Sequence, residues 1–235
     1  MTTYEVVLQL DNEIPVRDTI MEYPRLGVRI EYKDNKIASV IHTYTVSENL
    51  TEDQCLSYTK RHLRLLWELL EYRYGLPIKA SNSHIRILGE PRPATGRLEF
   101  FVDAALCKEV ILPKETILVK HPPRLMAWLR YVNDARNTRS DTEAIRLYYA
   151  AWEDMKGKPS QSHPAQATHL KHTRDFVSHG VRLTNPKALE FLKAELGQET
   201  NQYNPTDPVH CEFVRRQRYR ARELIEAEIE RELDI

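Results

Sequence analysis

The sequence has few cysteines, no net charge and no long apolar segment, and each absence excludes a class of protein. The three cysteines, Cys55, Cys107 and Cys211, are far apart and odd in number, which argues against a disulfide framework or paired-cysteine zinc site. Basic and acidic residues each total 34, so attraction for nucleic acid must come from a local patch. No apolar run approaches the roughly 18 residues that cross a bilayer, and the start lacks the features of a signal peptide. We therefore expect a cytoplasmic protein with no membrane partner.

The motifs of several common enzyme classes are also missing. There is no glycine-rich phosphate loop, no Walker lysine motif and no nucleophile elbow. A chain of 235 residues with 41% hydrophobic and 29% charged residues is ordinary for a globular protein. It is long enough for one large domain or two small ones.

Residues 1–112 have the pattern of an α+β domain whose role the sequence does not reveal. Apolar residues alternate with others over 5–10 and 28–32, as in a half-buried sheet, and Asp34-Asn35 indicates a turn into a third strand. Thr51-Glu-Asp-Gln54 is a capping-box signature that opens a helix reaching Gly75. Further strands are expected at 85–88, 98–102 and 116–119. The prediction is a mixed β-sheet with one long helix.

Prolines mark a change of pattern over residues 113–123, which we take as a linker. Residues 124–235 then predict helices only. Capping or proline start signals occur at Ser140–Glu143, His163-Pro164, Asn185-Pro186 and Asp207-Pro208. Helices joined by short loops predict a bundle, with core aromatic side chains from Trp128, Tyr148, Tyr149 and Trp152.

The segment from His169 to Gly180 contains the residues best suited to chemistry. Arginine presents a fixed positive fork that matches a phosphate, and histidine exchanges a proton near neutral pH. Arg174 and His179, with Asp175 beside them, suit metal-free cleavage of a phosphodiester. Five residues on an ideal helix turn through about 140°, however, so the pair converges only if the helix ends before His179 or a second protomer contributes. The structural alternative is an arginine paired with an acid and a histidine at a helix end.

A metal site is the rival chemistry for the same segment. His172, Asp175 and His179 are three and four residues apart, so they share one helical face, with His169 one turn away. Two histidines and a carboxylate suit a divalent ion. No clear fourth ligand is visible, and we predict neither a metal nor another cofactor.

A basic run near the C-terminus is a second candidate for contact with RNA. A helical face carrying arginines and an interleaved tyrosine could follow a phosphate backbone. Acidic residues follow at once, so a solvated, ion-paired face is the alternative. The candidates are Arg215, Arg216, Arg218, Arg220 and Arg222, with His172 added as a further RNA-binding candidate.

Arg174-Asp-Phe-Val-Ser-His179 resembles the Arg-x4–6-His motif of the HEPN superfamily, with the usual polar residue after the arginine. The layout of residues 121–235 is similar to the ApeA-like branch, which includes MauJ-like proteins. The resemblance implies a homodimer formed through the motif-bearing helices. It also implies a metal-independent endoribonuclease of a defence or toxin–antitoxin system, with RNA as substrate and a cognate antitoxin or sensor protein as a candidate partner. A non-catalytic RNA-binding or interaction module is the alternative for this fold.

Overall fold

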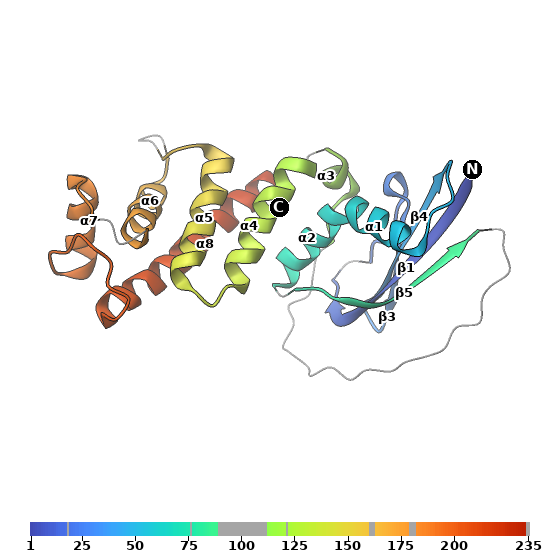
Figure 1. Cartoon of the computed structure of the whole chain (residues 1–235), viewed down its shortest axis with the longest axis horizontal. Coiled ribbons are helices and arrows are strands. Elements are labelled where there is room, and N and C mark those ends of the chain that lie inside the picture. The colour runs from blue at the N-terminus through green and yellow to red at the C-terminus, as the bar shows by residue number, and fades with distance from the viewer. Residues whose placement is uncertain are drawn as a thin grey trace. The chain divides into compact units, whose positions relative to one another are not determined.

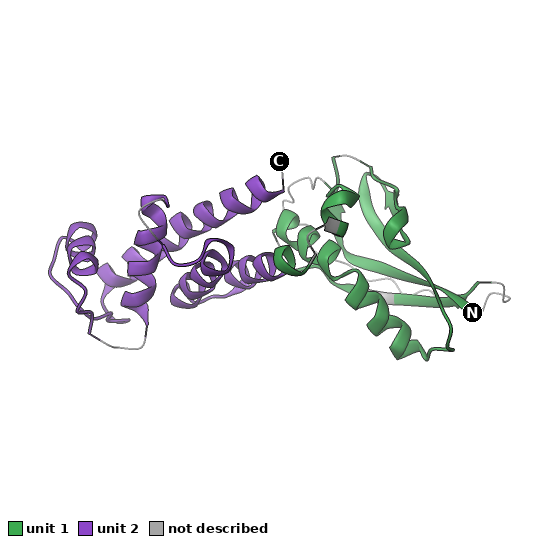
Figure 2. Cartoon of the chain, turned by 90° about the horizontal axis from the view of Figure 1, so that it is seen from above, with its two compact units in different colours: residues 1–126 green, residues 127–235 purple. Residues whose placement is uncertain are grey.

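The computed structural model describes residues 1–17, 19–75, 77–88, 112–120, 122–159, 163–178 and 182–233. The chain divides into two compact units, residues 1–126 and 127–235 (Figure 2). The division falls a few residues after the linker expected at 113–123, inside a helix. No helix in the described ranges combines the length and the apolar character that a bilayer span requires.

Unit 1 is built on a five-stranded sheet in the order β2-β3-β4-β1-β5. Every pairing within it is antiparallel, so the prediction of a mixed sheet was wrong. For β2–β3 and β3–β4 the physical reason is that a short connection joins two strands antiparallel, whereas a parallel pair needs a long crossover. Asp34 and Asn35 form such a connection, both with positive φ, as expected. The strands are β1 (Thr2–Pro15), β2 (Glu22–Tyr23), β3 (Val28–Lys33), β4 (Lys36–Val46) and β5 (Ala80–Ile87).

Two helices, α1 (Glu52–His62) and α2 (Arg64–Tyr74), lie against this sheet where one long helix was predicted (Figure 1). The capping box is confirmed: the Gln54 amide donates to the Thr51 side chain, and the Thr51 amide donates to Gln54 Oε1 at 2.9 Å. At Leu63 the backbone leaves regular helical geometry, with ψ of 3°. The Leu63 amide still donates to the Thr59 carbonyl, so the apolar spacing continues across the break and does not reveal it.

The segment 116–119 was expected to be a strand but belongs to α3 (Glu115–Lys120). Its β-branched residues favour a strand, yet tertiary contacts override that preference. The Tyr23 hydroxyl donates to the Pro113 carbonyl at 3.0 Å, and the Arg25 amide donates to Glu115 Oε1 at 2.6 Å. The strand expected at 98–102 lies outside the described residues.

Unit 2 takes its core from helices, as the sequence predicted. Trp128, Tyr148, Tyr149 and Trp152 are at most 4% exposed, so the expected aromatic core is confirmed. Helix α5 packs against both α6 and α8 (Figure 1). The helices are α4 (Pro122–Asn137), which begins in unit 1, α5 (Asp141–Lys156), α6 (Ala165–Val177), α7 (Pro186–Leu196) and α8 (Pro208–Glu232).

A buried histidine makes unit 1 sensitive to acid. His42 on β4 is 1% exposed, and its Nδ1 lies 3.1 Å from the Thr59 hydroxyl of α1. Burial, with a smaller effect from nearby His62, lowers the pKa of His42 to about 4. The unfolded chain therefore takes up this proton first as pH falls, and the folded state loses stability between about pH 6.5 and pH 4.

We expect His42→Gln to reduce this loss, which is on the order of 3 kcal/mol for a pKa lowered from 6.5 to about 4. The measurement is the urea midpoint of unfolding at a series of pH values. His84→Gln is the matched control because His84 is exposed on β5. The carboxylates affect the pH dependence of stability equally in both variants. Identical pH profiles for the two variants would therefore show that His42 is not the source of the acid sensitivity.

Candidate functional site

The candidate site lies at the C-terminal end of α6. This helix ends at Val177, and Ser178 adopts an extended conformation with ψ of 110°. The Ser178 hydroxyl donates to the Arg174 carbonyl at 2.6 Å and so satisfies one of the carbonyls that a helix end leaves without a partner. The helix therefore stops before His179 rather than at Gly180. His179 and Gly180 themselves lie outside the described residues.

Arg174 is held in a defined position on the last turn of α6. Its guanidinium carbon lies 4.2 Å from the centroid of the Tyr149 ring on α5, a cation–π distance. Its Nη1 lies 3.0 Å from Oδ1 of Asp175, and the two side chains are 32% and 26% exposed. The Nε donor is buried and has no hydrogen-bond partner. The group is thus oriented but accessible, with incomplete hydrogen bonding.

Sequence reasoning did not identify Arg146, which also contacts this helix end. Its Nη2 donates to the Val177 carbonyl at 3.0 Å, and its Nη1 lies 3.3 Å from Glu143. A cation here is favoured by the negative end of the helix dipole. Arg146 precedes Tyr149 by one turn of α5, so a single face of α5 contacts both Arg174 and the terminus of α6. The sequence shows that Arg146 and Tyr149 are one helical turn apart, but it does not show that both side chains contact α6.

The two other histidines of the segment pack against α7. The His169 ring stacks on Phe191 at 4.6 Å between centroids, and the His172 ring lies 5.7 Å from Phe191. His172 is 6% exposed, and its burial lowers the pKa of the imidazole although Asp175 acts in the opposite direction. Contact between this ring and RNA would require α7 to move.

No group of three potential metal ligands occurs among the residues that the structure describes. The sequence trio for a metal site includes His179, which is outside them. Its two described members, His172 and Asp175, differ in environment. His172 is buried against α7, whereas Asp175 is engaged by Arg174.

Each arginine of the basic run on α8 contacts an oxygen of the protein. Arg215 pairs with Glu212, Arg220 with Glu195, and Arg222 with Glu226, at 2.6 to 3.0 Å. Arg216 donates to the Glu195 carbonyl. Each of these exposed ion pairs contributes little to the stability of the fold. Together they reduce the positive charge that is available to bind an RNA backbone. The RNA-binding role of the run stays a prediction.

Arg218 differs from its neighbours because it joins three helices. Its Nη1 pairs with Asp141 at the start of α5 at 2.8 Å. Its Nη2 donates to carbonyls near the end of α4, those of Ala135, Arg136 and Thr138. The side chain is 20% exposed. Arg218 therefore caps α4 from α8.

We expect Arg218→Ala to lower the free energy of unfolding by on the order of 3 kcal/mol, because charged hydrogen bonds are lost and carbonyls are left without partners. Arg215→Ala is the matched control: its side chain is 59% exposed, and its loss should cost less than about 1 kcal/mol. Urea denaturation measures both. Equal midpoints for the two variants would disprove the capping role.

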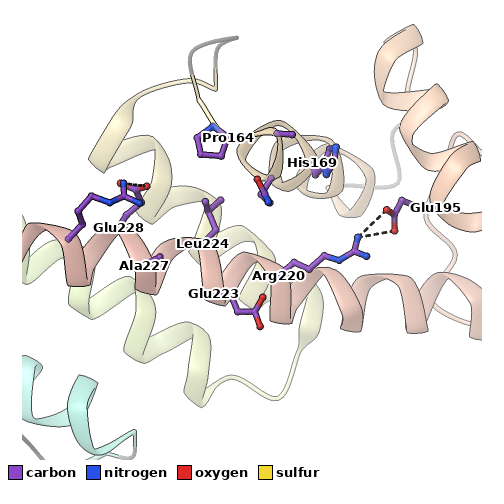
Figure 3. A pocket seen from close by; sticks show the side chains of 11 residues that line it. Pro164, His169, Glu195, Arg220, Glu223, Leu224, Ala227 and Glu228 are labelled. Carbon is purple, nitrogen blue, oxygen red and sulfur yellow. Dashed lines mark hydrogen bonds and ion pairs between the residues drawn. The ribbon is translucent and has the colours of Figure 1, made fainter. Parts of the chain in front are cut away.

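A groove of about 630 Å³ lies at the opposite end of α6. Figure 3 shows Pro164 and His169 on one side of it and Glu223, Leu224 and Ala227 of α8 on the other, with the Arg220–Glu195 ion pair at one end. Glu228 on its wall is buried and bonded to Arg231 at 2.6 Å. Burial would raise the pKa of Glu228, but Lys156 and Arg231 outweigh it and lower the pKa. Both arginines that line this groove, Arg220 and Arg231, are thus paired with glutamates, which reduces the positive charge that RNA would meet there.

Comparisons of the chain with protein-family models, curated proteins and solved structures give no match. The geometry around Arg174 and the Arg-x4-His spacing are therefore the features from which we infer a function.

Proposed function

We propose that the chain is a metal-independent endoribonuclease of HEPN type that cleaves RNA by transesterification. The observation that carries the proposal is the setting of Arg174: a partly exposed guanidinium, oriented by Tyr149 and Asp175, just before the point where α6 ends. Since the helix stops before His179, the 140° separation expected of an ideal helix no longer applies to this pair.

In the proposed reaction the 2′-hydroxyl of a ribose attacks the adjacent phosphorus. The new bond gives a 2′,3′-cyclic phosphate, and the bond from phosphorus to the 5′-oxygen breaks. His179 accepts the proton of the 2′-hydroxyl or protonates the departing 5′-oxygen. Arg174 neutralises the charge that grows on the non-bridging oxygens. Asp175 orients the guanidinium.

The active form in this proposal is a homodimer in which two Arg174–His179 pairs line one groove. The proposal takes this from the resemblance to HEPN domains, and the short distance in sequence between the two residues is compatible with it. A cognate antitoxin or sensor would act by controlling access to that groove or formation of the dimer. Such a system would serve defence or toxin–antitoxin functions.

The test is cleavage of mixed-sequence single-stranded RNA by the full chain in excess EDTA. We expect products with 2′,3′-cyclic phosphate ends, and no cleavage of the same sequence made with 2′-O-methyl ribose, because that nucleophile is blocked. Sedimentation of the same preparation reports the dimer. Cleavage that requires a divalent ion would point to the metal alternative with His172, Asp175 and His179.

A non-catalytic binding module is the second candidate. It is favoured by the contacts of Arg174 with Tyr149 and Asp175, which could be purely structural. It predicts a folded chain that cleaves no RNA under any of these conditions. In that case Arg174→Ala should change the melting temperature only.

A further inference from the structure

Unit 1 contains a pocket that is separate from the proposed nuclease site. Its volume is about 520 Å³, and its walls come from β1, α1, α2, β5 and the segment before β5. This is within the range of small-molecule sites, roughly 300–1,000 Å³. All of its lining residues fall between Leu8 and Ser83, so the pocket lies wholly within unit 1.

The interior of the pocket is apolar and held in shape by hydrogen bonds. Leu8, Leu63 and Ile78 line it and are at most 6% exposed. The Trp67 indole nitrogen donates to the Ile78 carbonyl at 3.3 Å, and the Ile78 amide donates to Glu71 Oε1 at 2.9 Å. These two bonds attach the segment before β5 to α2. The indole is therefore oriented before any ligand arrives.

Three cations, Lys60, Arg64 and Lys79, line the same pocket and are exposed. None of them forms an ion pair with any part of the chain that is described. Lys60 on α1 and Arg64 at the start of α2 lie on either side of the break at Leu63. Asp11 and Glu68 also line the pocket, but each already has an interaction of its own. The five charged side chains that line the pocket, three basic and two acidic, therefore carry a formal net charge of +1.

We propose that this pocket binds a small organic anion with an apolar body. The anionic group pairs with Lys60, Arg64 and Lys79, and the apolar body packs on Leu8, Leu63, Ile78 and the Trp67 ring. A purely apolar ligand would leave the cations without partners. A bare inorganic anion would leave the apolar wall unused, and an organic cation would be repelled.

The experiment is isothermal titration of the full chain with two probes of this class, decanoate and naphthalene-1-sulfonate. Acetate and inorganic phosphate test the charge without the apolar body, and decyltrimethylammonium tests the apolar body with the opposite charge. The variant is the double reversal Lys60→Glu, Arg64→Glu. The control is Arg61→Glu, a charge reversal next to Lys60 on α1 at a residue that does not line this pocket.

We expect at least one of the two probes to bind with a stoichiometry of one per chain, and the double reversal to weaken its binding at least about tenfold. Arg61→Glu should retain the affinity, and circular dichroism should show that both variants are folded. The inference is overturned if neither probe binds, if the reversal leaves the affinity unchanged, or if phosphate or the cationic probe binds as tightly. None of these outcomes depends on RNA cleavage.

Discussion

Replacing His179 with alanine should lower the rate of RNA cleavage in EDTA by about 10²- to 10⁴-fold, the usual contribution of a positioned general acid or base. The reason is that histidine exchanges protons near neutral pH, and the other histidine close to Arg174 in the sequence, His172, is buried, with its pKa lowered by that burial. Single-turnover rates with excess enzyme isolate the chemical step from binding.

The pH dependence sharpens this prediction. The wild-type rate should depend on a group that titrates near neutrality, and that dependence should disappear from the residual activity of His179→Ala. His84→Ala is the control, since His84 is exposed on β5 of unit 1. A wild-type rate of cleavage in His179→Ala would remove His179 from the proposed mechanism.

Arg174→Ala should lower the same rate by about 10²- to 10³-fold, as expected for the loss of a group that stabilises developing negative charge. Arg174→Lys keeps the charge but loses the planar fork and its contact with the Tyr149 ring, 4.2 Å away in the wild type. We therefore expect an intermediate rate for the lysine variant. If Arg174 were purely structural, variants with the same melting temperature as wild type would also cleave RNA at the wild-type rate.

Arg130→Ala is the charge-matched control for this series. Arg130 is 61% exposed on α4 and lies 3.8 Å from Asp134, so its removal changes the net charge equally without touching α6. Its cleavage rate should equal that of wild type. If Arg130→Ala and Arg174→Ala lost activity equally, general electrostatic attraction of RNA would be the cause instead of a local role at the phosphate.

The candidate site illustrates which features of a site can be predicted. Arg174, Asp175 and His179 were identified because they are close in sequence and chemically distinctive. Arg146 was missed because its contact with the Val177 carbonyl spans 31 residues. The basic run on α8 was identified as a group, yet Arg218 differs from the rest only through contacts with residues 77 to 83 positions away.

The features of the fold that could be predicted are likewise those that depend on residues close together in the sequence. The capping box at Thr51, the turn at Asp34-Asn35 and the helix starts at Asn185 and Asp207 were all visible in the sequence. Each depends on hydrogen bonds within about four residues, so local sequence contains all the interacting groups. The aromatic core of unit 2 was visible for a related reason, because the spacing of its residues follows the helical repeat.

What the sequence determined by itself was thus the local hydrogen bonding, the periodicity and the residues with distinctive chemistry. Tertiary structure alone decided the antiparallel sheet, the helical form of 116–119, the separate role of Arg218 and the grouping of Lys60, Arg64 and Lys79 around an apolar pocket. The physical reason is that these features depend on groups brought together by packing from distant parts of the chain, where local preference is a weaker influence than burial and pairing.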